Sequence, residues 1–403
     1  MEWKEVRLGD VCEIKGGKRL PKGINLITQK NSHPYIRVRD LGKSKTLELN
    51  SSYEYVDEIT QKQIQRYITL KGDILISIVG TIGLIAIVGG SLNGANLTEN
   101  CVKLVKLDNI DSEYLYYYLK SPLGQQNISR GTVGAVQAKL PIKNIQEFNI
   151  NCPVLISDQR RIASILSSLD RKIELNNKIN ADLEEMAQAI FKNWFVDFEP
   201  FKGGKFVDSE LGMIPEGWKV GSPYEYVKVV YGAPYKSAKF NDHGEGLPLI
   251  RIRDLKDCNP QFYTPEILPQ TEYVNKGDIV AGMDAEFVPH IWKGNTGLLN
   301  QRVCKLMPQQ TSISNLFVLY LMKPELEFVQ SYKTGTTVSH LGKADIDKFV
   351  VVLPPLEVVE ECSKILDSIL QRIKNLSAES SRLSLLRDTL LPRLMSGELE
   401  VPK

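Results

Sequence analysis

The sequence contains a long internal duplication, and no other feature constrains the fold as strongly. The segment Pro34–Leu41 returns as Pro248–Leu255, and both share the pattern Ile-Arg-x-Arg-Asp-Leu. Lys71–Ile74 matches Lys276–Ile279, and further matches follow in the same order. One unit written twice predicts two similar globular halves related by an approximate two-fold axis. Such a chain would suit a partner that itself has two parts.

Composition and size fit an ordinary globular protein of two to three domains. The chain has 403 residues, of which 42% are hydrophobic and 24% charged. The longest apolar run, Ile74 to Val88, is interrupted by glycines and is too short to cross a bilayer. The first residues show no basic and apolar pattern of a secretory signal. We therefore expect a cytoplasmic protein that does not bind a membrane.

Charge and cysteine content leave the partner open but argue against a metal site. The formal net charge of +2 allows a polyanionic partner without demanding one. No two cysteines form a C-x-x-C pair, so reduced thiols in a cytosolic core are a better reading than metal or redox chemistry. The six residues are Cys12, Cys101, Cys152, Cys258, Cys304 and Cys362.

A heptad pattern follows each globular half and predicts a long helix there, because the seam positions alternate steps of four and three. The first seam consists of Ile162, Leu166, Leu169, Ile173, Asn176, Asn180, Leu183, Ala187, Ile190 and Trp194. The second consists of Cys362, Leu366, Ile369, Ile373, Leu376, Ser380, Leu383, Arg387 and Leu390, and we expect it to end at Pro392. Either seam alone could be one face of a core helix, but two of similar length favour an antiparallel pair. Asn176 should then lie near Ser380, because each is the polar break of its seam.

These patterns divide the chain into four parts and predict an α+β fold. Two pseudo-symmetric globular domains, 1–157 and 201–356, are joined by two long antiparallel helices, 158–200 and 357–403, which form a coiled-coil spacer. Within the first domain Ser112 should cap a helix that runs through Tyr114 and Tyr118, and Pro122 should end its first part.

A circular repeat concerns the joints between these parts. The first part of Ser209–Lys219 returns near the C-terminus as Ser396–Pro402, and its last part returns at the N-terminus as Glu2–Lys4. The chain end would therefore continue into the chain start as the internal joint does. We expect the two termini to lie close together.

No catalytic motif can be assembled, so the sequence indicates a binding protein and not an enzyme. The stretch Gly16–Lys18 lacks the spacing and the hydroxyl residue of a phosphate-binding loop. Asn151–Val154 lacks the second proline and the aromatic residue of a base-methylating site. The four histidines lie far apart in sequence and match no nucleophile pattern.

Two glycine- and proline-rich basic loops are the first candidates for binding, because their backbones could approach a phosphate chain. The alternative for both is a solvated run of charge. The first loop offers Lys15, Lys18, Arg19 and Lys22, and its counterpart offers Tyr235, Lys236 and Lys239.

The repeated arginine segment and the loop before the last strand of each half are further candidates. Strand alternation predicts Arg37 and Arg39 on one face with Tyr35, and Ile36 and Val38 in the core; Arg251 and Arg253 should repeat this. Asp40 and Asp254 should each pair with one arginine and leave the other for a partner. The later loops, Gly131–Lys139 and Gly335–Lys343, place Gln137 and His340 at nearly equivalent positions, together with Lys139 and Lys343. Differences between matched loops are where two half-sites would be read differently.

The order of motifs resembles the specificity subunit of type I restriction–modification systems over essentially the whole chain. The resemblance rests on the central block Phe191–Phe198, on Ser209–Gly212 with Pro215–Trp218, and on Leu386–Leu394 with Gly397–Leu399. It implies two target recognition domains that read a bipartite, asymmetric DNA sequence. It also implies that the helical spacer sets the gap between half-sites and docks two methyltransferase subunits, with restriction–translocase subunits completing the complex. S-adenosylmethionine and ATP with magnesium would then belong to the partner subunits alone.

The length of the first helix agrees with this role. A helix from Ile162 to Trp194 is about 48 Å long at about 1.5 Å per residue, and half-sites one DNA turn apart are separated by about 34 Å. Two alternatives remain: the DNA-reading subunit of a related system whose partner both methylates and cleaves, and a coiled-coil scaffold whose globular halves bind proteins.

Overall fold

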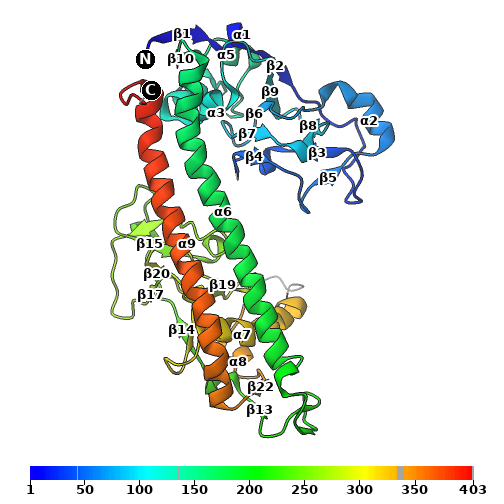
Figure 1. Cartoon of the computed structure of the whole chain (residues 1–403), viewed down its shortest axis with the longest axis vertical. Helices are drawn as coiled ribbons and strands as arrows, with labels where there is room; N and C mark the ends of the chain where they lie inside the picture. The colour runs from blue at the N-terminus through cyan, green and yellow to red at the C-terminus, as the bar shows by residue number, and fades with distance from the viewer. Residues whose placement is uncertain (43, 135, 334–339, 402–403) are drawn as a thin grey trace. The chain divides into compact units, whose positions relative to one another are not determined.

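The computed structural model describes residues 1–42, 44–134, 136–333 and 340–401, which form two compact units (Figure 1). Unit 1 comprises Met1–Ile173 with Arg382–Lys403, and unit 2 comprises Glu174–Ser381. Each unit therefore contains one globular body and a section of each of the two long helices, α6 (Ile156–Phe195) and α9 (Leu356–Ser396).

Unit 1 is built on two small sheets and one strand pair. The five-stranded sheet has the order β2-β9-β6-β7-β4, the three-stranded sheet has the order β5-β3-β8, and β1 pairs with β10. The strands are β1 (Trp3–Arg7), β2 (Glu13–Gly16), β3 (Pro34–Ile36), β4 (Thr46–Leu47), β5 (Glu54–Tyr55), β6 (Ile74–Ser77), β7 (Ile85–Val88), β8 (Asn96–Leu97), β9 (Cys101–Val105) and β10 (Asn149–Pro153). The shorter α-helices are α1 (Leu8–Val11), α2 (Glu58–Ile64), α3 (Ser112–Lys120), α4 (Pro122–Gly131) and α5 (Ile142–Gln146), and η1 (Val38–Asp40), η2 (Gln65–Tyr67) and η3 (Gly90–Leu92) are 3-10 turns.

Unit 2 repeats this arrangement. The order β14-β21-β18-β19 corresponds to β2-β9-β6-β7, the order β16-β15-β20 corresponds to β5-β3-β8, and β13 pairs with β22 as β1 does with β10. The strands are β11 (Phe206–Val207), β12 (Ile214–Pro215), β13 (Lys219–Gly221), β14 (Val227–Tyr231), β15 (Leu247–Ile250), β16 (Tyr263–Thr264), β17 (Tyr273–Val274), β18 (Ile279–Gly282), β19 (Pro289–Ile291), β20 (Gly297–Leu299), β21 (Val303–Pro308) and β22 (Val351–Leu353). The remaining elements are α7 (Asn315–Lys333), α8 (Lys343–Ile346), η4 (Glu199–Phe201), η5 (Pro223–Glu225), η6 (Ser237–Lys239) and η7 (Ile252–Asp254). The predicted duplication and the α+β class are confirmed.

In unit 2, α6 and α9 run antiparallel, as the seams predict. The Asn176 amide donates to Ser380 Oγ at 3.4 Å, and the Asn180 amide donates to Ser377 Oγ at 3.1 Å. Residue numbers rise along one helix as they fall along the other, which defines the direction. The expected meeting of Asn176 and Ser380 is confirmed, and Glu379 Oε2 accepts a shorter bond from Asn176 at 2.9 Å.

The same antiparallel pairing holds in unit 1, where Arg387 Nη1 lies 2.8 Å from Asp170 Oδ1. Ile162 and Leu166 share one apolar core with Leu391 and Leu394. Every seam position of both helices is buried or half-buried. These side chains therefore hold each helix pair together, and the fully buried ones present nothing to a partner subunit.

Two expectations about helix ends are wrong. α9 does not end at Pro392 but continues to Ser396. A proline inside a helix costs roughly 3 kcal/mol, and burial of Leu391, Leu394 and Met395 in the unit 1 core offsets that cost. The helix ends before Gly397, whose φ of +79° suits the left-handed residue that closes many helices. Asp111, and not Ser112, caps α3, because its carboxylate accepts the Glu113 and Tyr114 N–H groups.

Prolines at matched places act differently in the two units. Pro122 separates α3 from α4 as predicted, because the preceding Ser121 is extended and its hydroxyl caps α4 by accepting the Gly124 N–H. Pro324 lies inside α7, where Lys323 precedes it and offers no capping oxygen.

The chain termini lie close together within unit 1, as the circular repeat predicts. The Met1 amino group is 3.2 Å from Glu400 Oε1. A Cβ built on Gly397 would meet the Trp3 ring at 2.9 Å, so the two segments are in contact. Within the described ranges no helix combines the length and apolar character needed to span a bilayer.

Candidate nucleic-acid interface

The repeated arginine segment of unit 1 is a turn and not the extended strand that alternation predicted. β3 ends at Ile36, all three of its residues are buried, and η1 follows directly. Asp40 Oδ2 accepts the Arg37 N–H at 2.7 Å and closes this turn. Tyr35 is buried between neighbouring strands β5 and β8, so it does not share an exposed face with the arginines.

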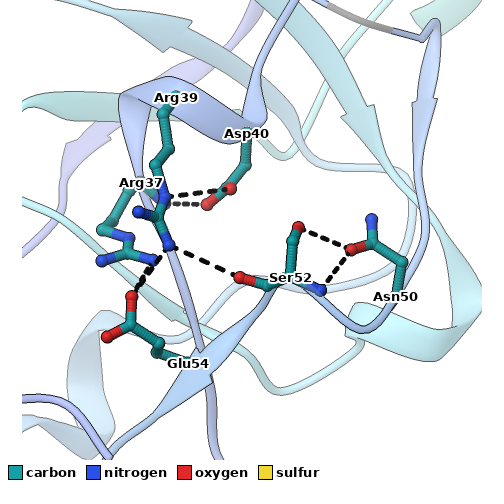
Figure 2. A network of polar contacts seen from close by, with 6 residues as sticks. All are labelled: Arg37, Arg39, Asp40, Asn50, Ser52 and Glu54. Atoms are coloured by element: carbon teal, nitrogen blue, oxygen red, sulfur yellow. Dashed lines mark hydrogen bonds and ion pairs between the residues drawn. The ribbon is translucent and has the colours of Figure 1, made fainter. Parts of the chain in front are cut away.

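Glu54 holds both arginines of this segment (Figure 2). Its carboxylate is 2.8 Å from Arg39 Nη2, and Arg37 pairs with the same carboxylate. Arg39 also donates to the Ser52 carbonyl at 3.4 Å, and the Asn50 side chain holds that loop by accepting the Ser52 N–H and hydroxyl. Asp40 Oδ1 lies 3.9 Å from Arg39 Nε, so the expected pairing of Asp40 with one arginine is confirmed. The expectation that the other arginine stays free is wrong in this unit, because Glu54 lies against both.

Unit 2 replaces this carboxylate with an aromatic ring. Pro34 is paired with Tyr55 and Pro248 with Tyr263, so Phe262 stands at the position of Glu54. The Arg251 guanidinium lies 4.3 Å from the Phe262 ring centre, and its Nε is 3.4 Å from Asp254.

Arg253 corresponds to Arg39 and is exposed. Among the residues that the structure describes, its side chain forms no hydrogen bond or ion pair. The two units therefore present the same turn with different charge: a neutralised pair in unit 1 and an uncompensated arginine in unit 2.

The first basic loop carries its charges at the surface, most of them beside an internal partner. Lys15 is 2.8 Å from Glu13, and Arg19 Nε is 2.6 Å from Glu99. Lys18 Nζ lies 5.6 Å from the Tyr67 ring centre, and Lys22 is exposed. Surface pairs of this kind contribute little stability, so these cations can exchange their partners for a phosphate.

The second loop only partly matches its prediction. Tyr235 is wrong as a contact residue, because it is 5% exposed and its hydroxyl donates to Thr271 at 3.0 Å. The Lys236 N–H and the Lys239 ammonium both lie 2.9 Å from the carboxylate of Glu266. These two donors, with the Lys236 N–H first, lower the pKa of Glu266. The Lys236 side chain remains exposed.

The loops before the last strands are matched by backbone bonds, which correct the expected alignment. The Leu140 N–H donates to the Ile78 carbonyl at 3.0 Å, and the Leu341 N–H donates to the Met283 carbonyl at 2.7 Å. Lys139, and not Gln137, therefore corresponds to His340.

The candidate side chains in these loops differ in their exposure and in their hydrogen-bond partners. Gln137 and Lys139 are exposed in unit 1, and Lys343 is exposed at the start of α8. His340 Nδ1 lies 2.7 Å from Asp284 Oδ1. The predicted segment 335–337 lies outside the described residues.

Neither metal nor thiol chemistry is arranged in the described parts of the chain. Within those parts no three side chains of histidine, cysteine, aspartate or glutamate gather at metal-binding distance. All six cysteines are free. Burial raises the pKa of Cys12, Cys101, Cys304 and Cys362 to about 12, so these thiols stay protonated and unreactive.

Four residues at the candidate sites of the two units were not found from the sequence. They are Glu54 and Phe262, which lie against the repeated arginines, and Asp284 and Arg302, which pair with each other at 3.0 Å. Each becomes important through a partner on a different segment of the chain, which the folded backbone brings close. For Glu54, the sequence signal would have been its pairing opposite Tyr35 in the sheet. A strand of two residues such as β5 is too short to show an alternating pattern from which that register could be predicted.

Comparison with known proteins identifies relatives along the whole chain. The family model described as "Type I restriction modification DNA specificity domain" matches residues 1–185 and 215–383. The MjaIX type I restriction enzyme specificity subunit of Methanocaldococcus jannaschii is 26% identical over 427 aligned positions, covering 99% of this chain and 94% of that protein. The EcoBI specificity subunit of Escherichia coli is 29% identical over 190 positions, covering 46% of this chain and 40% of that protein.

A solved structure shares the fold. The crystal structure of the type I restriction–modification S subunit from M. genitalium aligns over 98% of this chain and 96% of that chain, with a TM-score of 0.56 and 16% sequence identity. Two family matches, one on each half of the duplication, agree with the repeated frame of units 1 and 2. The chain belongs to the family of type I restriction–modification DNA specificity domains.

Proposed function

We propose that this protein is the non-catalytic subunit that gives a type I restriction–modification complex its DNA sequence specificity. Each globular half, 1–157 and 201–356, would read one half of an asymmetric, bipartite target. The observation that carries the proposal is one backbone frame used twice with different exposed side chains. Arg39 faces Glu54 in unit 1, whereas Arg253 stands free of any acid among the described residues in unit 2.

Phosphate contacts would position each half, and base contacts would select the sequence. The positioning contacts that we propose are exposed cations near the repeated loops: Lys15, Lys18, Arg19, Lys22, Lys139, Lys236, Lys239, Arg253 and Lys343. Arg37, Arg39 and Arg251 lie at the same turn, and Gln137 and His340 lie in the loops where the two units differ.

The helical segments 158–200 and 357–403 would act as the spacer that fixes the distance between half-sites. We propose that their outer faces dock two methyltransferase subunits, and that restriction–translocase subunits join the same complex. S-adenosylmethionine and ATP with magnesium would bind to those partners, and the complex would act on DNA in the cytoplasm. The alternative is a related system in which a single partner both methylates and cleaves.

The test is to co-express the chain with the neighbouring genes of its genome, purify the complex and map methylated bases on genomic DNA. We expect one bipartite sequence, methylated in both halves. Duplex binding should weaken steeply with salt, because each neutralised phosphate releases counterions. A complex that forms but shows no salt-dependent duplex binding and no sequence preference would support a protein scaffold instead.

A further inference from the structure

Unit 2 contains a side-chain cluster that its sequence duplicate lacks. Asp284 uses one carboxylate oxygen for each of two neighbours: Oδ2 is 3.0 Å from Arg302 Nη1, and Oδ1 is 2.7 Å from His340 Nδ1. The three residues come from the ends of separate segments, after β18, before β21 and before α8. One acid therefore fixes an arginine and a histidine side by side.

The shared frame shows that the fold does not require this cluster. The Met283 N–H donates to the Arg302 carbonyl in unit 2, and the Ile78 N–H donates to the Asn100 carbonyl in unit 1. With the loop match of His340 and Lys139, the unit 1 counterparts are Val79, Asn100 and Lys139. Unit 1 builds the same turns with one apolar, one neutral and one cationic side chain.

Exposure argues that the cluster is not there for stability. The Arg302 side chain is 55% exposed, and the side chains of His340 and Asp284 are 48% and 26% exposed. Ion pairs this accessible contribute little free energy of folding. A carboxylate does, however, fix the direction in which a guanidinium points, which matters where a planar ligand must be met.

Arg302 and His340 keep hydrogen-bonding groups that their contacts with Asp284 do not use. A carboxylate only accepts, so His340 Nδ1 carries a proton, and in the neutral form of the ring the Nε2 atom is an acceptor. Arg302 uses Nη1 for Asp284, which leaves Nε–H and Nη2–H as a two-donor fork. Within the described residues nothing else bonds to this fork or to His340 Nε2.

We propose that this cluster reads a G·C base pair through the major groove, an inference that rests on the proposed function. The Arg302 fork matches the O6 and N7 acceptors of guanine, the commonest specific contact between proteins and DNA. His340 Nε2 matches the N4 amino group of cytosine, the donor on the same groove edge. Asp284 is the positioning residue. Unit 1 offers no such fork at Asn100, so the two half-sites differ at this place.

The experiment uses the full chain in its complex with the co-purified methyltransferase subunits and a randomised duplex library. The wild-type complex should select a bipartite target with an invariant G·C pair in the half read by unit 2. Replacing that guanine by 7-deazaguanine, which lacks N7, should weaken wild-type binding about tenfold, since one of the two bonds of the bidentate contact is lost.

Three variants distinguish recognition of the base pair from an effect of net charge and from a folding defect. Arg302→Lys keeps the cation but replaces the two-donor fork by a single ammonium, so it should keep salt-dependent binding, weaken the preference at that pair and lose less affinity with 7-deazaguanine than the wild type does. Asp284→Ala should relax the same preference. Asn100→Ala, at the matched place in unit 1, should leave the G·C pair selected.

The outcomes distinguish a failure of the proposed function from a failure of the proposal that the cluster reads a base pair. If the wild-type complex selects no bipartite sequence, the proposed function itself fails. If it selects one, and Arg302→Lys keeps every preference while 7-deazaguanine has no effect at any guanine of that half, the cluster does not read a base and the inference is overturned. Thermal unfolding of Arg302→Lys should match the wild type, which excludes a folding defect as the cause.

Discussion

At the scale of single residues, the acid or ring opposite the repeated arginines should set the charge that each unit offers to DNA. Glu54→Gln removes the carboxylate held by Arg37 and Arg39, so we expect tighter duplex binding at low salt. The slope of log affinity against log salt should become steeper by about one for each arginine that gains a phosphate. Folding stability should change little, because these side chains are partly exposed.

Phe262→Glu is the matched change in unit 2 and should act in the opposite direction. The new acid would stand beside Arg251 and near Arg253, weaken duplex binding and make the salt slope shallower. Salt titrations of both variants in the purified complex measure the effect. Equal slopes for the wild type and both variants would show that this turn does not face the DNA backbone.

Two glycines hold the basic loops against the small sheet. A Cβ on Gly17 would lie 2.0 Å from the Thr98 carbonyl oxygen, and a Cβ on Gly232 would lie 2.2 Å from that of Asn300. Gly17→Ala should therefore reduce the free energy of unfolding by about 1–3 kcal/mol, the usual cost of overpacking. Gly90→Ala is the control, since nothing lies within 4 Å of its Cβ. Denaturant unfolding checks both, and equal losses would contradict the clash.

The arginine segment also shows what sequence can predict at this scale. Its repetition predicted that both halves share one local structure, and both segments form the same turn. Duplication is visible in the sequence without any structure. Its partners were not visible, because Glu54 is brought to Arg39 by the pairing of the two-residue strand β5 with the three-residue strand β3. The alternation rule also fails where the chain turns after Ile36.

At the scale of elements, the polar contacts between α6 and α9, Asn176 with Ser380 and Asn180 with Ser377, should lower folding stability while they fix the register of the two helices. Asn176 is fully buried, and its Oδ1 has no hydrogen-bond partner among the described residues. Asn176→Leu should raise the free energy of unfolding by about 1 kcal/mol, because an unsatisfied buried oxygen is costly, while the register against α9 becomes less defined. Thermal unfolding and hydrogen exchange of the helix amides measure the two effects. A clear fall in melting temperature would show that the bonds to Glu379 and Ser380 are worth more than the apolar contact.

The helices were predicted better than the strands, for a physical reason. A heptad seam repeats over many turns, so single errors average out, and the pairing of Asn176 with Ser380 followed from matching the two polar breaks. Helix ends depend on single residues: Pro392 is tolerated inside α9 by the burial of its neighbours, and Gly397 marks the end.

At the scale of the whole molecule, the proposed spacer role requires that α6 and α9 set a length. Four residues inserted after Lys178 add about 6 Å of helix, slightly more than one turn. A matching insertion after Ala378 would keep the pair in step, because the Asn180–Ser377 and Asn176–Ser380 contacts bracket both sites. Four residues return the seam to nearly the same face, since a turn takes 3.6 residues.

The doubly inserted chain should keep both half-site sequences and prefer a gap longer by about two base pairs, at about 3.4 Å each. Mapping methylated bases in the complex measures gap and sequences together. The matched control substitutes Lys178→Ala without insertion, which should leave the gap unchanged because Lys178 is exposed. Because recognition residues and spacer residues lie in different elements, a longer gap with unaltered half-sites assigns distance to the helices. An unaltered gap would mean that something other than these helices sets the distance, and the spacer role would have to be abandoned even if both halves still read DNA.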